Sequence, residues 1–127
     1  MFPFLLVGLG GALGAMARYG FGAFVSGRML AEGGWPWATF LENVGGGFLM
    51  GLLVGWLGLR GFAGEDLRLF LGVGLLGGFT TFSAFSLEMM TMVERGSTGL
   101  AILYGAASVL LALAALAAGL WLVRLFA

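Results

Sequence analysis

The sequence predicts an all-α integral membrane protein with four transmembrane helices in each subunit. Of its 127 residues, 61% are hydrophobic and only 9% are charged, whereas a soluble domain carries roughly 25% charged residues. A helix needs about 20 apolar residues to cross a bilayer, so four such helices use most of the chain. We therefore expect residues 1–127 to form a single transmembrane domain with no separate soluble domain.

Composition also excludes several classes of function. The chain has no Cys and no His, its six basic residues are all arginine, and its net charge is zero. Thiol chemistry, disulfides, imidazole bases and soft metal sites are therefore absent. No basic patch is available for nucleic acid. The N-terminus has no charged leader and no small-residue cleavage site, so we expect the first apolar segment to belong to the mature protein.

The first span is expected over about residues 3–24. Gly10 and Gly14 repeat at the spacing that lets helix backbones approach closely in lipid. Arg18 lies toward the far end of this span. It is expected either to extend to the lipid headgroups or to stand at the mouth of an anion vestibule.

The second span, about residues 36–59, begins in a Trp-Pro-Trp sequence typical of a membrane interface. Its apolar sequence contains Thr39, Glu42 and Asn43. Further along, Gly47, Gly51 and Gly55 form a stripe of small residues that predicts close helix packing.

The third span, about residues 67–93, is predicted to be broken at Gly77–Thr81. Adjacent glycines weaken a helix, and backbone carbonyls freed at membrane depth are tolerated only inside protein or beside a wet cavity. The Gly77–Ser86 stretch therefore predicts an ion site. The fourth span is expected over about residues 99–123, with Tyr104 and Ser108 on one helical face.

The arginines do not favour one orientation in the membrane. The predicted spans place Arg60, Arg68 and Arg124 on the side of both termini. Arg28 and Arg95 lie on the other side, joined by Arg18 if it reaches that surface. The positive-inside rule needs a clear excess on one side. We therefore expect dual topology, which allows an antiparallel homodimer.

The polar and aromatic residues predicted at membrane depth favour anion transport. Phe82 and Phe85 share a helical face, and the positive edges of two phenyl rings can line an anion path. The amide of Asn43 and the hydroxyls of Tyr104 and Ser108 can replace part of an anion's hydration shell. The remaining polar candidates are Thr39, Thr80, Thr81 and Ser83, together with the carboxylates Glu42 and Glu88. No nucleophile–base pair or phosphate loop is present, so we predict a transport protein and not an enzyme.

Three segments resemble the Fluc/CrcB fluoride-channel family along almost the whole chain. They are Gly10–Tyr19, the Asn43 region with its glycines, and the highly specific Gly77–Glu88 segment. The resemblance implies small four-helix subunits that assemble as antiparallel, dual-topology homodimers in the inner (plasma) membrane of bacteria. It also implies export of cytoplasmic fluoride, which enters cells as the neutral weak acid and is trapped as the anion.

The resemblance assigns roles to individual residues. It implies a structural Na⁺ at the dimer axis, held by the backbone carbonyls of Gly77 and Thr80 from each subunit. It implies two fluoride pores in one dimer and places Arg18 near the vestibule. The pore residues that we expect are Asn43, Phe82, Phe85, Tyr104, Ser108, Thr39, Thr81 and Ser83.

The chain departs from the family pattern at Glu42, Ala84 and Ala112. The last two positions only lose hydroxyls. Glu42 matters more, because an ionisable residue in a span is a candidate for function and a fixed negative charge repels an anion. If Glu42 is protonated at rest, it is either a buried acid beside a passive channel or the coupling residue of a proton-gated or proton-coupled transporter.

Two other classes remain as alternatives. A small multidrug-type antiporter also has four short spans, but it relies on a carboxylate in its first span, where this chain has only Arg18. A purely structural membrane subunit would explain the glycine stripes. It would not explain why Asn43, Phe82, Phe85 and Tyr104 gather at membrane depth.

Overall fold

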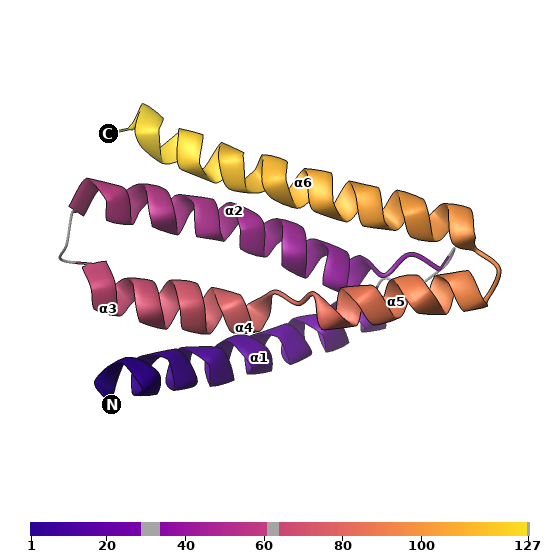
Figure 1. The fold of residues 1–127 in the computed structure, drawn as a ribbon, viewed down its shortest axis with the longest axis horizontal. Coiled ribbons are helices and arrows are strands. Elements are labelled where there is room, and N and C mark those ends of the chain that lie inside the picture. Colours follow the sequence, from indigo (N-terminus) through magenta and orange to yellow (C-terminus); the bar gives the residue numbers. More distant parts are fainter. Residues whose placement is uncertain (29–33, 61–63, 127) are drawn as a thin grey trace.

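The computed structural model describes residues 1–28, 34–60 and 64–126. They form four long helical segments, and successive segments run in opposite directions (Figure 1). Three segments are single helices: α1 (Phe2–Arg28), α2 (Trp37–Arg60) and α6 (Thr98–Leu125). The segment between α2 and α6 consists of α3 (Glu65–Leu67), η2 (Arg68–Leu76), α4 (Gly77–Phe79) and α5 (Ser83–Glu94). The prediction of four helical segments is confirmed.

All four segments are long and apolar enough to cross a membrane, over Phe2–Gly27, Trp37–Arg60, Glu65–Glu94 and Thr98–Leu125. The predicted spans lie within one to three residues of these ends. Most of the helices continue past the predicted limits to a charged or glycine residue. Residues 29–33 and 61–63, which fall in the predicted connections, lie outside the described residues.

The predicted break in the third segment is confirmed, but its position is corrected. Gly77–Phe79 is helical, and the interruption covers residues 80–82, beginning where Thr80 turns extended with φ −82° and ψ 155°. The glycines serve close packing here. A methyl group on Gly78 would lie 2.6 Å from the carbonyl oxygen of Gly11 in α1. The helix therefore continues through the glycines and unwinds one residue after Phe79.

The two glycine stripes pack the helices in pairs, as predicted. Gly10 and Gly14 place α1 directly against the backbone of η2. On α2, a methyl group at Gly47 would lie 2.8 Å from the carbonyl oxygen of Ala112 in α6, and a methyl group at Gly51 would overlap the carbonyl oxygen of Leu116. With these contacts, α1 holds the third segment just before its break, and α6 is fixed along α2.

Both chain termini lie at one end of the bundle, together with the end of α2 and the start of α3 (Figure 1). Arg60, Arg68 and Arg124 are at this end, and Arg28 and Arg95 are at the other, as predicted. At the second end, the side chains of Phe40, Phe85, Met92, Ala101 and Tyr104 form the buried core that joins α2, α5 and α6.

Candidate functional site

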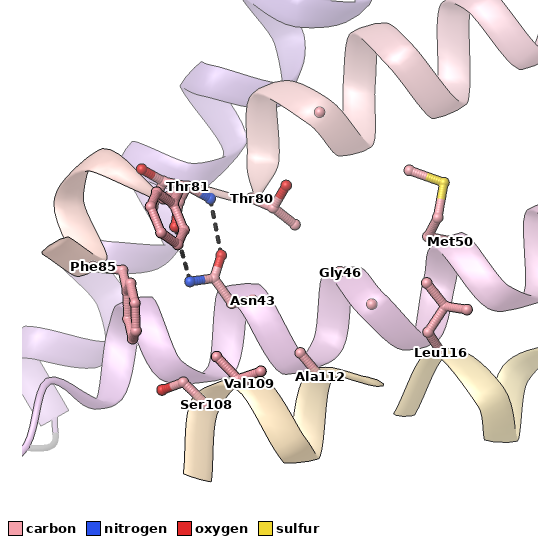
Figure 2. Close-up of a pocket in the computed structure, with 13 residues that line it drawn as sticks. Asn43, Gly46, Met50, Thr80, Thr81, Phe85, Ser108, Val109, Ala112 and Leu116 are labelled. Carbon is pink, nitrogen blue, oxygen red and sulfur yellow. Dashed lines mark hydrogen bonds between the residues drawn. The ribbon is translucent and has the colours of Figure 1, made fainter. Parts of the chain in front are cut away.

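A cavity of about 480 Å³ lies beside the break in the third segment. Its lining residues come from α2 (Asn43, Gly46, Gly47, Met50), the break region (Gly77, Thr80, Thr81, Phe82), α5 (Phe85) and α6 (Ser108, Val109, Ala112, Leu116). Most of them are visible in Figure 2. We call this space the break cavity. None of the described residues that line it is charged, so it combines apolar walls with a few neutral polar groups.

Asn43 holds the unwound backbone at Thr81. Its Nδ2 donates to the carbonyl oxygen of Thr81 at 2.9 Å, and the N–H of Thr81 donates to its Oδ1, also at 2.9 Å (Figure 2). A primary amide suits this task, because it offers both a donor and an acceptor. One N–H of Nδ2 remains after these two bonds. Asn43 therefore lines the break cavity, and its amide oxygen and one of its two N–H groups stabilise the break.

These bonds change the partners of two neighbouring carbonyls. In a continuous α-helix, the N–H of Thr81 would bond to the carbonyl of Gly77, and that of Ala84 to the carbonyl of Thr80. Here the first donates to Asn43, and the second donates to the Thr81 hydroxyl at 3.2 Å. The carbonyls of Gly77 and Thr80 therefore lack the partners that a regular helix would supply.

Arg18 reaches the same break from α1. Its side chain is half-buried, and its Nε donates to the carbonyl oxygen of Gly78 at 3.2 Å. A continuous helix would satisfy this carbonyl through the N–H of Phe82. The arginine thus binds to the backbone of the third segment instead of extending only to the lipid headgroups. Its charge therefore lies close to the unwound residues.

Phe82 and Phe85 share a face, as predicted. Their ring centroids are 5.6 Å apart with an interplanar angle of 41°, and Phe85 in turn lies 5.3 Å from the ring of Tyr104. Phe82 is 76% exposed, whereas Phe85 is 7% exposed. The aromatic row therefore leads from an open face of the subunit into its core.

Glu88 organises the polar end of this row, a role that the sequence did not assign to it. Thr39 donates to its Oε1 at 2.6 Å, and the Tyr104 hydroxyl donates to its Oε2 at 2.8 Å. One carboxylate thus joins α2, α5 and α6. The spacing in the sequence could have indicated this role, because Glu88 lies one helical turn beyond Phe85 and so lies on the same face of the helix.

The two predicted serines have different surroundings. Ser108 is buried at 4% exposure and lines the break cavity, and its hydroxyl has no hydrogen-bond partner within residues 1–28, 34–60 and 64–126. Ser83 is exposed and does not line the cavity. Its hydroxyl lies 3.4 Å from that of Thr81 at the start of α5. The structure therefore brings Ser108, but not Ser83, to the cavity.

Glu42 lies in a different place from its neighbour Asn43. It is 3% exposed and lines a second cavity, of about 370 Å³, with Arg18 and Thr39. Adjacent helical residues point about 100° apart, and this rotation turns the carboxylate away from the break cavity. The expectation that Glu42 need not share the face of Asn43 is confirmed.

Known proteins are similar to this chain over nearly its whole length. The family model of the CrcB-like proteins, described as Camphor Resistance (CrcB), matches residues 5–120. A Hyphomonas neptunium protein is 55% identical over 95% of this chain and 94% of its own length. A Phenylobacterium zucineum protein is 59% identical over 94% of each chain. Both relatives are named fluoride-specific ion channel FluC.

Replacing Asn43 with Asp tests whether the amide holds the break. The variant Asn43→Asp keeps the acceptor for the Thr81 N–H but places a second oxygen against the Thr81 carbonyl. We expect a loss of about 1–3 kcal/mol in stability and faster amide hydrogen exchange around residues 80–82. The control Thr91→Ala removes a hydroxyl that bonds only within its own helix α5, to the carbonyl oxygen of Leu87. Unchanged exchange in Asn43→Asp would contradict this role.

Proposed function

Because the chain belongs to the CrcB-like family, we propose that it is a fluoride channel of the bacterial plasma membrane that releases cytoplasmic fluoride passively. The observation that carries this proposal is the identity of 55–59%, over nearly full length, to proteins named fluoride-specific ion channels. The four apolar helices agree with a multi-pass membrane protein. Fluoride that enters as the neutral acid ionises in the cytoplasm, and the negative interior of the cell drives the anion out.

The break cavity supports permeation over tight capture. A channel must compensate the dehydration of an ion and still release it. The cavity provides neutral donors and phenyl rings without a fixed positive charge in its lining. Fluoride can exchange water for the remaining Asn43 N–H and the free Ser108 hydroxyl, and pass beside the positive edges of Phe82 and Phe85.

The other pore candidates hold neighbouring groups in place or add charge near the break. The hydroxyls of Thr39 and Tyr104 both donate to Glu88, so they fix the carboxylate at the inner end of the aromatic row. Thr81 supplies the backbone that Asn43 holds, and Ser83 stands beside the Thr81 hydroxyl at the start of α5. Arg18 supplies a positive charge near the break, which attracts anions toward this region.

The subunit is proposed to function as an antiparallel homodimer with two pores. Phe82 and Gly77 both line the break cavity and are exposed in the single chain. A second copy related by a two-fold axis would cover this open side. The nearly balanced arginines at the two ends support insertion in both orientations.

The carbonyls of Gly77 and Thr80 fit a structural Na⁺. Hard cations prefer oxygen ligands, and these two carbonyls lack their regular helical partners and border an open cavity. With the same pair from a second copy, the site would offer four oxygens. A bound Na⁺ would hold the two breaks together at the dimer axis.

The alternatives receive less support. A multidrug-type antiporter needs an acid in its first span, and α1 contains no Asp or Glu. Proton-coupled fluoride transport needs Glu42 on the permeation path. Its carboxylate instead faces a cavity separate from the one that Asn43 and the phenyl rings line.

Reconstitution into liposomes tests the channel. Liposomes loaded with potassium fluoride should release fluoride rapidly once valinomycin removes the opposing voltage, and chloride-loaded liposomes should not release chloride. Ser108→Ala should slow release roughly threefold to tenfold, the worth of one hydrogen bond. The matched control Thr91→Ala, which removes a hydroxyl bonded within α5 to Leu87, should leave the rate unchanged. A folded protein without fluoride release would support the structural-subunit alternative.

Cysteine labelling tests dual topology. The chain has no Cys, so Ser97→Cys in the turn after α5 and Phe126→Cys at the opposite end give single labelling sites. An impermeant maleimide should modify each variant partly in right-side-out vesicles and partly in inverted vesicles. Complete labelling of Ser97→Cys from one face only would show a single orientation.

Removal of sodium tests the proposed Na⁺ site. Replacing Na⁺ by N-methylglucamine at constant ionic strength should lower the melting temperature of the purified protein and release monomers. Thr80→Ala is the matched control, because it removes the hydroxyl that bonds to Leu76 and keeps the backbone carbonyl. It should remain sodium-dependent. An identical melting temperature in both buffers would exclude the site.

A further inference from the structure

The carboxylate of Glu42 faces a cavity that the proposed permeation path does not use. The cavity lies between α1 and α2 at the start of α5, and Arg18, Tyr19 and Thr39 contribute to its lining. Helix α1 passes directly over the carboxylate, since a methyl group at Gly22 would lie 3.6 Å from its Oε1. We call this space the Glu42 cavity.

The two carboxylates near α2 differ in their hydrogen bonds. Glu88 accepts one bond at each oxygen, from Thr39 and Tyr104. Glu42 is 97% buried, and no hydrogen bond reaches its carboxylate from the described part of the chain. A buried carboxylate is stabilised by a counter-charge or by a proton. For stabilisation by a proton, the Glu42 cavity supplies the route along which the proton reaches the carboxylate.

Arg18 carries the charge opposite to that of an ionised Glu42 and lines the same cavity, without a direct ion pair between these two side chains in the described part of the chain. Opposite charges that share a cavity attract each other where little water screens them. The arginine also bonds to Gly78 at the break. Its charge therefore acts on the Glu42 cavity and, across the unwound residues, on the neighbouring break cavity.

Other ionisable groups near Glu42 come from three elements. Helix α1 contributes Arg18 and Tyr19, α5 contributes Glu88, and α6 contributes Tyr104. A negative charge on Glu88 repels one on Glu42. The hydrogen bonds that Glu88 accepts from Thr39 and Tyr104 already stabilise the Glu88 carboxylate. Arg68, the titratable residue at the start of η2, is paired with Glu65 of α3. Helix α3 lies at the other end of the bundle (Figure 1). Arg18 is thus the cation whose effect Glu42 can change.

We propose that Glu42 is a proton-binding site that regulates fluoride entry by controlling how much of the Arg18 charge is compensated. The inference rests on the proposed channel function. When Glu42 is ionised, its carboxylate offsets the charge of Arg18. When it takes up a proton, the positive charge at the break is left uncompensated and attracts fluoride. Fluoride current therefore increases as the pH falls, the condition under which the neutral acid enters cells fastest.

Electrical recording of Glu42→Gln tests this proposal. Current is the appropriate measure, because neutral hydrogen fluoride that leaks through lipid carries none. The wild-type current should rise about tenfold from mildly alkaline to mildly acid pH, the effect of one charge on local anion concentration. Glu42→Gln should stay at the high, acid level at every pH. Glu94→Gln removes an exposed carboxylate outside the cavity and should keep the wild-type pH dependence.

Each result separates this inference from the channel proposal. A wild-type current that does not change with pH, or an equal pH dependence in wild type and Glu42→Gln, would overturn the role of Glu42 and leave the channel intact. No fluoride current in any folded variant would overturn the channel itself. Uphill fluoride accumulation driven by a proton gradient in wild type, and lost in Glu42→Gln, would replace both with coupled transport.

Infrared spectroscopy measures the proton directly. A protonated carboxyl group has a C=O stretching band distinct from that of a carboxylate. The wild-type spectrum should lose such a band as the pH rises over the range in which the current falls, and Glu42→Gln should lack the band. This readout does not depend on fluoride current. A wild-type band identical to that of Glu42→Gln at all pH values would contradict the proposal.

Discussion

The structure depends on one constraint: backbone polar groups released inside a membrane protein must find new partners. The third helical segment unwinds at residues 80–82, where lipid cannot replace the lost hydrogen bonds. The side chain of Asn43 supplies both a donor and an acceptor to Thr81, and Arg18 supplies a donor to Gly78. These two side chains come from α2 and α1, so the break exists only where three helical segments are packed together.

This arrangement also explains why binding groups gather at one place. Satisfying Thr81 and Ala84 with side-chain oxygens leaves the carbonyls of Gly77 and Thr80 without their helical donors. The same turn starts α5 and aligns Phe82 with Phe85. Two carbonyls without helical donors and a pair of adjacent phenyl rings therefore result from a single local interruption. The glycines of α1 and η2 keep it in place by holding the two backbones in contact.

Much of this was predictable from the sequence, because long apolar segments and small-residue repeats have strong physical consequences. The four spans, the glycine faces and the presence of a break follow from such patterns. The exact start of the break did not. Gly77 and Gly78 look like helix breakers, but both are helical, and Gly78 packs directly against Gly11 of α1. The role of Glu88 was also missed, since its partners Thr39 and Tyr104 are 49 and 16 residues away in the sequence.

Glu42 and Asn43 show that two adjacent residues can act in different ways, one through hydrogen bonds and the other through its charge. A rotation of about 100° between neighbours on α2 gives Asn43 to the break cavity and Glu42 to the second cavity. Hydrogen bonds act over about 3 Å and depend on geometry, so Asn43 has to touch the break. A charge acts over a longer distance, especially where little water screens it. An acid can therefore change the attraction that an anion experiences without occupying its path.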